Sequence, residues 1–172
     1  MTHADPDFDR FVDTHVDGLL RTAYLIVWDA TEAEDVVQEC LFKVARRWPK
    51  VRSMEQPLAY TRRILINLAN DGARARARRR GELDHDTVEA PDTSTNPFGG
   101  LESRDELIEE LGKLPERQRA VLVLRYFHDM TEAQAADVLG CSQGTVKSSA
   151  SRGLARLREA FEISPQPGTT ET

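Results

Sequence analysis

The segment TEAQAADVLGCSQGTVKSSASR, residues 131–152, decides the fold of the C-terminal half of this chain. Thr131 and Gln134 have the spacing of a capping box, which predicts a helix start. Gly140 suits a left-handed helix end, and Ser142 suits the cap of the next helix. A short helix, a tight turn and a second helix form a helix-turn-helix, which we therefore predict here.

The second helix of this unit, residues 143–158, has two faces of different chemistry. Its apolar face consists of Val146, Ala150, Gly153, Leu154 and Leu157. The opposite face carries Thr145, Ser148, Ser149, Arg152 and Arg156, with Lys147 on the flank. Small hydroxyl side chains weaken a helix, but they permit close approach to base edges in a major groove about 12 Å wide. This chemistry favours DNA binding, and the alternative is a helix pair that only packs.

The charges of the chain are sorted into blocks. The formal net charge is −6, yet residues 1–42 carry −8, residues 43–80 carry +10 and residues 81–110 carry −9. A strongly basic segment attracts polyanions over about 8–10 Å even within an acidic chain. We interpret residues 43–80 as a nucleic-acid-binding segment, with a solvated helix face as the alternative.

Apolar residues spaced three or four apart predict three helices in the N-terminal half. The first covers residues 8–27. The second opens at Thr31, where Glu34 completes a capping box, and ends before Pro49. The third starts at about residue 57 with a favourable first-turn proline and continues to residue 80.

The composition changes at residues 81–101, which are rich in Asp, Thr, Pro and Gly. Such a segment favours a flexible acidic linker. Four helices are predicted beyond it, and strict alternation of apolar and polar residues is absent from the sequence. We therefore predict an all-α protein with two small helical domains, residues 1–80 and 102–163, followed by a disordered tail at 164–172.

Several classes of protein are disfavoured. No stretch approaches the roughly 20 apolar residues that span a bilayer, so we expect a cytoplasmic protein without membrane contact. Cys40 and Cys141 belong to no CxxC or Cys/His cluster. The four histidines, at 3, 15, 85 and 128, have no ligand spacing, and no Gly-rich phosphate loop or activated nucleophile is present. We predict no metal, no cofactor and no enzymatic activity.

Three segments together resemble a known family: DATEAEDVVQECLFKVARRWP (29–49), AYTRRILINLANDGARARARR (59–79) and LPERQRAVLVLRYFHDMTEAQAADVLGCSQGTVKSSASRGLARLR (114–158). They resemble the extracytoplasmic-function (ECF) sigma factors of bacterial RNA polymerase, and are most similar to the actinobacterial SigE family. The resemblance implies a region 2-like domain, a linker and a region 4-like domain. It also implies a promoter-specificity subunit that binds core RNA polymerase, recognises −35 and −10 promoter elements and directs transcription initiation.

The resemblance also implies residue roles. In such proteins the AEDVVQ segment docks on clamp helices of the largest polymerase subunit. The implied core-polymerase-binding residues are Asp35, Gln38, Leu41 and Phe42. Without the resemblance, the alternative is that Asp35 and Gln38 form a solvated pair on one helix face.

The loop 49–57 and the helix after it correspond to the part that captures a flipped base of the −10 element. The implied −10 DNA-binding residues are Tyr60, Arg62, Arg63, Asn67, Arg74 and Arg76. The Asn67 amide can pair with a base edge, although a capping or core-linking role is the alternative, and the arginines would neutralise phosphates. Trp48 could stack on a base, but at a helix end it more often belongs to the core.

The helix-turn-helix corresponds to the −35 reader, with Thr145, Lys147, Ser148, Ser149 and Arg152 as the implied DNA-binding residues. Family members commonly have arginine where Ser149 stands and alanine where Gly153 stands. The first departure removes a DNA contact, and the second costs about 1 kcal/mol of helix propensity. Both departures bear on which promoter sequence is recognised and not on the role of the helix as the −35 reader.

A stand-alone helix-turn-helix regulator, binding an operator as a dimer without polymerase, is the alternative function. Two separate DNA-facing regions favour the sigma factor. The partners implied are core RNA polymerase, promoter DNA and, as in many relatives, an anti-sigma factor. We further hypothesise that the acidic linker screens the basic N-terminal domain in the free protein.

Overall fold

The structure is a computed structural model that describes residues 5–81 and 104–161. The N-terminal half contains α1 (Pro6–Val27), α2 (Ala30–Ala45), α3 (Trp48–Val51) and α4 (Pro57–Arg80). The C-terminal half contains α5 (Arg104–Gly112), α6 (Glu116–Leu122), a π-helical turn η1 (Val123–Phe127), α7 (Glu132–Leu139) and α8 (Gln143–Phe161). No strand occurs within these two ranges, which confirms the all-α prediction.

The start of α2 differs from its prediction. The carboxylate of Asp29 accepts a hydrogen bond from the Glu32 amide at 2.8 Å, so Asp29 is the N-cap. The capping box predicted between Thr31 and Glu34 is therefore wrong, because the helix begins a residue before Thr31. The negative charge of an aspartate at the N-cap also interacts favourably with the positive end of the helix dipole. The TEAE pattern at residues 31–34 does not reveal this contribution.

The segment between α2 and α4, predicted as a loop, contains the short helix α3. The indole of Trp48 anchors it, since only 5% of this residue is exposed. The rings of Phe8 and Phe11 from α1 lie 5.3 and 5.0 Å from the Trp48 ring. Burial of a large aromatic ring is worth a few kcal/mol, and it assigns Trp48 to the core.

The helix-turn-helix forms as predicted. The Thr131 hydroxyl accepts from the Gln134 amide at 3.1 Å, and the Gln134 side chain accepts from the Thr131 amide at 2.9 Å. Gly140 ends α7 with φ of 64°, the left-handed conformation that glycine adopts readily. The Ser142 hydroxyl accepts from the Thr145 amide at 3.1 Å and caps α8.

Each half has an interior of aliphatic side chains. In the N-terminal half, α1, α2 and α4 pack together, and α4 buries Thr61, Leu65, Ile66 and Ala69. In the C-terminal half, α6 and α7 pack on α8 around Val121, Leu122, Leu139, Val146 and Leu154. Cys40 is fully buried, and burial raises the pKa of its thiol to about 12.

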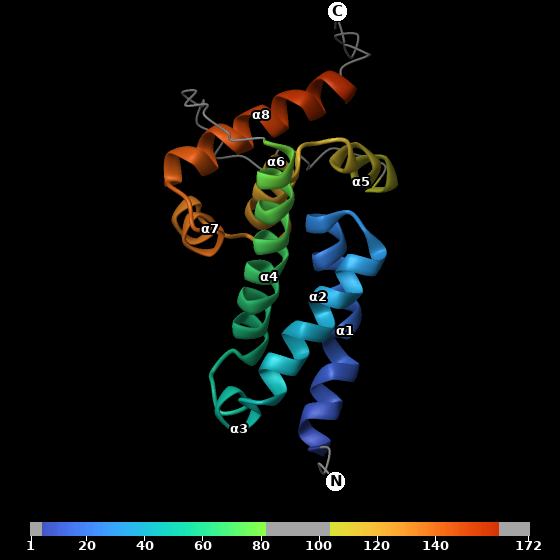
Figure 1. The fold of residues 1–172 in the computed structure, drawn as a ribbon, viewed down its shortest axis with the longest axis vertical. Coiled ribbons are helices and arrows are strands. Elements are labelled where there is room, and N and C mark those ends of the chain that lie inside the picture. Colours follow the sequence, from blue (N-terminus) through green and yellow to red (C-terminus); the bar gives the residue numbers. More distant parts are fainter. Residues whose placement is uncertain (1–4, 82–103, 162–172) are drawn as a thin grey trace, which may run out of the picture.

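The two halves lie against each other (Figure 1). Helix α1 contacts α5, α6 and η1, and α4 contacts α6 and α7. The buried apolar residues of both halves form one continuous cluster. The expected linker beyond Gly81 and the expected disordered tail lie outside the described residues. None of the described helices is long and apolar enough to cross a membrane.

The cap of α2 gives a direct test of this local structure. We expect Asp29→Ala to lower the free energy of unfolding by about 1 kcal/mol, because the Glu32 amide loses its acceptor. Thr31→Ala should not lower it, because the Thr31 side chain is exposed and alanine has the higher helix propensity. Urea unfolding followed by circular dichroism measures both. A larger loss for Thr31→Ala than for Asp29→Ala would restore the predicted capping box.

Candidate promoter and polymerase interfaces

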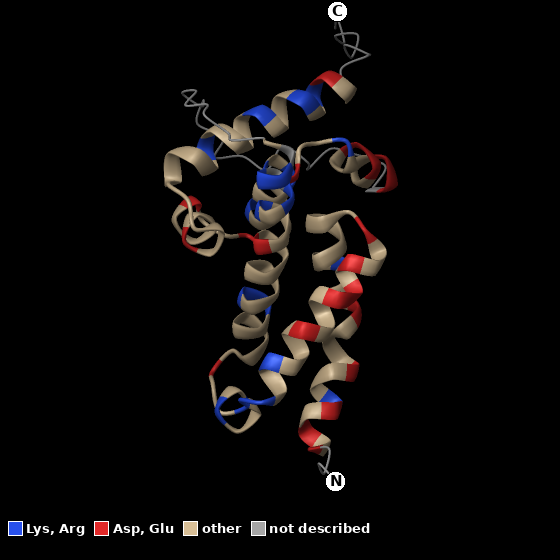
Figure 2. Cartoon of the chain, in the orientation of Figure 1, with Lys and Arg blue, Asp and Glu red and all other residues tan. Residues whose placement is uncertain are grey.

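Acidic and basic side chains occupy different parts of the fold (Figure 2). Acidic residues follow α1, α2 and α5, whereas basic residues gather around α3 and along α4, most densely at its C-terminal end. Most of the basic residues of this block therefore lie on α3 and α4, apart from the acidic helices. Such clustering of basic side chains is the electrostatic feature expected of a nucleic-acid-binding protein.

Four of the residues predicted to bind the −10 element share one side of α4. Tyr60, Arg63, Asn67 and Arg74 are separated by three, four and seven residues, which places them in one row along the helix. Asn67 is exposed in this row. The other two members of the set, Arg62 and Arg76, point elsewhere. We call this row of α4, together with Asn70, the α4 reading face.

The α4 reading face is in contact with α7 of the helix-turn-helix. Arg63 forms an ion pair with Asp137. The Asn70 amide donates to the Leu139 carbonyl at 3.1 Å. Arg74 donates to the Leu139 carbonyl and, at 2.9 Å, to the Gly140 carbonyl. The acceptors are thus one carboxylate and the last carbonyls of α7.

Arg76 joins three helices. Its guanidinium pairs with Glu32 of α2 and, at 2.9 Å, with Glu116 of α6. Burial works to lower the pKa of Arg76, but the hydrogen bonds to Glu32 and Glu116 outweigh it and raise the pKa. Arg76 therefore has a structural role in this conformation, whereas the sequence predicted a phosphate contact.

Arg119 of α6 is the most deeply buried charged side chain among the described residues, with 3% exposed. Its guanidinium donates to the Ile26 carbonyl of α1 at 3.0 Å and to the Leu114 carbonyl at 2.9 Å. It also lies 5.5 Å from the centre of the Trp28 ring. Burial lowers the pKa of this guanidinium, which nevertheless stays charged.

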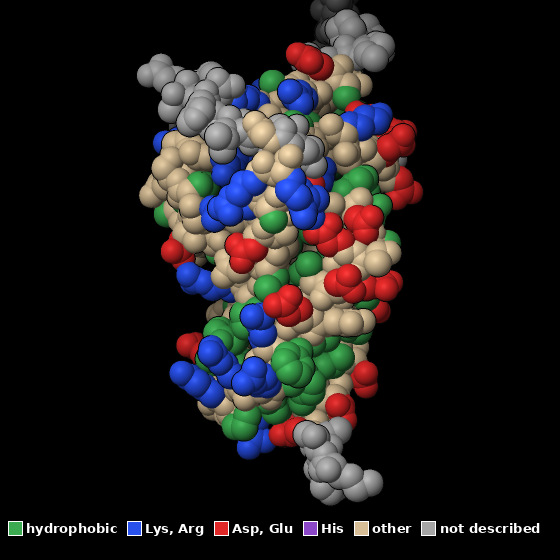
Figure 3. Space-filling view, viewed as in Figure 1, with side chains coloured by type: hydrophobic (Ala, Val, Ile, Leu, Met, Phe, Trp, Pro, Cys, Tyr) green, Lys and Arg blue, Asp and Glu red, His purple; other side chains and the backbone are tan. Residues whose placement is uncertain are grey.

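The structure adds three basic residues that the sequence did not single out. Lys43, Arg46 and Arg47, at the end of α2, line a hollow of about 400 Å³ with Tyr60 and Ile64 of α4. Basic side chains beside apolar ones are visible at this lower end of the molecule (Figure 3). The sequence signal was their place in the basic block, but only packing of α2 on α4 places them next to Tyr60.

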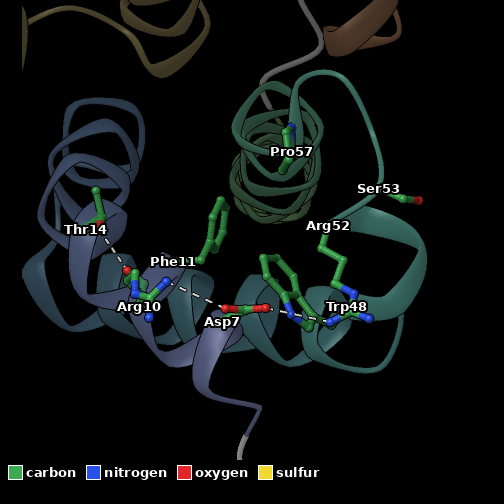
Figure 4. A pocket seen from close by; sticks show the side chains of 8 residues that line it. All are labelled: Asp7, Arg10, Phe11, Thr14, Trp48, Arg52, Ser53 and Pro57. Atoms are coloured by element: carbon green, nitrogen blue, oxygen red, sulfur yellow. Dashed lines mark hydrogen bonds and ion pairs between the residues drawn. The ribbon is translucent and has the colours of Figure 1, made fainter.

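A second hollow, of about 550 Å³, adjoins the segment between α3 and α4 (Figure 4). Phe11 and Trp48 supply aromatic rings, and Arg10, Arg52 and Asp7 supply charges. Asp7 pairs with Arg10 at 3.7 Å and with Arg52 at 3.8 Å. Because the Trp48 ring is almost wholly covered, the accessible surface of this hollow comes from Phe11 and from the charged side chains around it.

The residues predicted to bind polymerase lie on the outer side of α2. Asp35 and Gln38 are exposed, Leu41 is half-buried, and Phe42 is 64% exposed, the largest exposure of a large apolar side chain in the described ranges. Leu41 and Phe42 line a hollow of about 520 Å³ whose acidic members are Asp9 and Asp13 of α1. An exposed aromatic ring beside an apolar hollow is typical of a protein-binding surface.

The predicted −35 reader is arranged differently from its prediction. Lys147 is exposed and pairs with Glu132 at 3.6 Å, and Thr145 and Arg152 are half-buried. Ser148 and Ser149 are only 4% and 7% exposed, so their placement on the outer face was wrong. Helix α8 is flanked by α5, α6 and α7, and its buried arc is wider than a one-sided helix predicts. The contact of Ser148 and Ser149 with DNA stays a prediction.

Within residues 5–81 and 104–161, no group of three or more His, Cys, Asp or Glu side chains is placed to hold a metal ion.

Residues 11–79 match the family Sigma-70 region 2, and residues 104–157 match Sigma-70, region 4. The RNA polymerase sigma-E factor of Streptomyces avermitilis is 36% identical over 165 residues, covering 94% of this chain and 89% of that protein. The sigma-E factor of Streptomyces coelicolor is 35% identical over 153 residues, covering 89% and 85%. This chain belongs to the sigma-70 family of RNA polymerase sigma factors, and within that family it is of the ECF type and similar to sigma-E factors.

A solved structure agrees with this assignment. The sigma factor RpoE of Bartonella quintana, in complex with the anti-sigma factor NepR, is 27% identical and has a TM-score of 0.59. The match covers 94% of this chain and all of that one. The chain is thus a promoter-recognising subunit of RNA polymerase, and the two halves correspond to regions 2 and 4.

A histidine between the halves gives a test of their packing. His128 Nε2 lies 3.2 Å from the Thr22 hydroxyl of α1. Burial, followed by the charge of Arg62, lowers the pKa of His128 below its ordinary value of 6.5, and Asp129 opposes this only in part. The folded state therefore disfavours the protonated imidazole.

We expect stability to be lost as the pH falls below about 6.5, because the unfolded state then binds a proton that the folded state resists. His128→Gln keeps a polar partner for Thr22 and removes the titration. Urea unfolding between about pH 7.5 and pH 5.5 should show a steeper loss for the native protein than for the variant. Parallel profiles would assign the pH dependence to other groups.

Proposed function

We propose that this sigma factor binds core RNA polymerase through the outer side of α2, with Asp35, Gln38, Leu41 and Phe42 as the contact residues. The exposed Phe42 ring beside the apolar hollow of α1 and α2 is the observation that carries this assignment. The acidic rim of that hollow favours a polymerase segment with apolar and basic side chains. Phe42 can be truncated with little cost to folding, because most of its surface is already in water.

We assign recognition of the −10 element to the α4 reading face and to the basic residues around it. Asn67 would contact a base, and Arg62, Arg63, Arg74 and Arg76 would contact phosphates, as the sequence predicts. Lys43, Arg46 and Arg47 extend this basic surface beside Tyr60, where an unpaired base could stack. The hollow beside Phe11 is a candidate for the flipped base, because it adjoins the segment 52–57.

We assign recognition of the −35 element to α8, where the residues that reach DNA most readily are Thr145, Lys147 and Arg152. Ser148 and Ser149 are predicted contacts as well, but α8 would have to expose these two side chains before they could touch DNA. The proposed domains are residues 1–80 and 102–163. By analogy with the relative crystallised with NepR, an anti-sigma factor is a proposed partner. We further propose that the protein acts in the cytoplasm and has no catalytic activity of its own.

Run-off transcription tests the polymerase assignment. Core polymerase of Streptomyces coelicolor, freed of its own sigma factors, is combined with this protein and a pool of templates with randomised −35 and −10 positions. We expect transcripts that depend on the protein. Asp35→Ala/Gln38→Ala and Phe42→Ala should each reduce them about tenfold, because central contacts carry most of an interface's binding energy.

Asp17→Ala is the matched control for this experiment, because it removes one charge from an exposed position of α1. It should transcribe like the native protein. If no transcripts appear while the protein alone shifts a specific DNA, the stand-alone regulator is correct and the polymerase surface is wrong.

Two substitutions separate base contact from phosphate contact within the assembled polymerase. Asn67→Ala should relax the preference at one −10 position, with a loss of about 1–3 kcal/mol for the preferred base. Arg63→Ala should weaken promoter binding for all sequences alike and lower the salt slope by about one. Sequencing of transcripts from the template pool measures the first, and promoter binding at several salt concentrations measures the second. Uniform weakening by Asn67→Ala would remove Asn67 from the base-reading set.

A further inference from the structure

The N-terminal part of α8 carries a single charged side chain. In a helix-turn-helix, the first residues of the second helix contact the base edges. Among residues 142–151, only Lys147 is charged. Ser148 and Ser149 follow it directly, but both are covered. Charged contacts between this part of α8 and DNA therefore depend on Lys147.

Lys147 is paired with a carboxylate of the preceding helix. Its Nζ atom lies 3.6 Å from Oε2 of Glu132, the first residue of α7. The pair thus joins the two helices of the helix-turn-helix. The side chain of Glu132 is 33% exposed and that of Lys147 is 56% exposed. The distance is too long for a hydrogen bond, so the ammonium is attracted to Glu132 but keeps its three N–H donors for another acceptor.

A lysine can contact DNA in two ways that differ in what they recognise. A contact to a phosphate oxygen holds the protein on any sequence, whereas a contact to O6 and N7 of guanine in the major groove distinguishes that base. The lysine side chain is flexible and its ammonium acts as a point charge, so an unrestrained Lys147 would pair readily with the nearest phosphate. A group that restrains Lys147 therefore affects the selectivity of α8.

The position of Glu132 favours the selective contact. In a helix-turn-helix the first helix crosses the DNA backbone, while the second lies in the major groove. Glu132 belongs to the first turn of that first helix. The amides at a helix N-terminus attract phosphate, but a carboxylate in the same turn repels it. Glu132 therefore attracts the ammonium of Lys147 and disfavours a phosphate at the same place.

We propose that Glu132 is a positioning residue for −35 recognition, which restrains Lys147 so that its ammonium contacts a guanine and not a phosphate. The inference rests on the function proposed for α8 above, and it names the residue that adjusts the selectivity of that helix. Glu132 acts through Lys147 and touches no base itself. No sequence pattern singled out Glu132, because Thr131 and Gln134 alone make the capping box.

The experiment uses this protein bound to core polymerase of Streptomyces coelicolor. The promoters are randomised at the −35 element, and their −10 element is fixed at the sequence that the first template pool selects. Sequencing of the transcripts gives the ratio of preferred to disfavoured bases at each position. We expect Lys147→Ala to lower the preference for guanine about tenfold at one position. Glu132→Gln, which removes only the charge, should lower it there about two- to fivefold, the range for an exposed ion pair.

A double-mutant cycle shows whether Glu132 acts through Lys147. With Lys147 present, Glu132→Gln should raise the salt slope of binding to a disfavoured promoter by about one, because the released ammonium gains a phosphate. In the Lys147→Ala background, Glu132→Gln should change neither this slope nor any base ratio. Glu109→Gln is the matched control, because it makes the same change at an exposed position of α5. It should give the native profile.

The outcomes separate this inference from the proposed function. If Lys147→Ala leaves the −35 profile unchanged, Lys147 does not read the promoter, and the inference falls with that part of the proposed function. If Lys147→Ala changes the profile but Glu132→Gln does not, or if Glu132→Gln acts equally without Lys147, only the role of Glu132 is wrong. A weakened start of α7 would lower transcription from all templates alike, so it cannot account for a change in the ratio at one position.

Discussion

The packing of the two halves depends on one buried cation. Helix α1 ends at Val27 with no basic side chain in its last turn, so its C-terminal carbonyls need a donor from elsewhere. Arg119, almost wholly buried on α6, supplies that donor to the Ile26 carbonyl. A buried guanidinium is tolerated only where its N–H groups are satisfied, so α6 has few positions available to it against α1. With α6 in that position, α7 lies beside α4.

The interface that results is largely polar at its outer side. Across it, Arg63, Arg74 and Arg76 meet acceptors from α6, α7 and the turn after α7, while the apolar part lies deeper, around α1, α5 and α6. Polar contacts of this kind exchange readily for contacts with water or phosphate, because their net contribution to stability is small. Contacts of these arginines with phosphate would therefore have to replace the ion pairs and hydrogen bonds that they form here.

Small residues in α8 are explained by packing as much as by DNA. Gly153, expected to cost helix propensity, lies where a Cβ would come within 2.9 Å of Leu122 Cδ1. Leu122 is fully buried, so an alanine at this position would have to displace a core side chain. Ser148 and Ser149 are likewise covered, and the Ser148 hydroxyl donates to the Thr145 carbonyl at 3.1 Å. Small residues such as glycine and serine, which the sequence suggests are there for DNA contact, also allow neighbouring helices to pack closely.

The sequence by itself determined the local structure and the family. The cap at Thr131, the left-handed Gly140 and the cap at Ser142 depend on residues a few positions apart, so their pattern predicts the helix-turn-helix directly. The prediction from sequence was wrong at the start of α2, where Asp29 and Thr31 are both possible caps. It was also wrong between α2 and α4, where burial of Trp48 stabilises the short helix α3 in a segment predicted as a loop. Only the tertiary structure decided that α7 rests on the α4 reading face, that Ser148 and Ser149 are covered, and that Lys43, Arg46 and Arg47 join Tyr60. These facts depend on contacts between residues far apart in the chain, which helical periodicity does not encode.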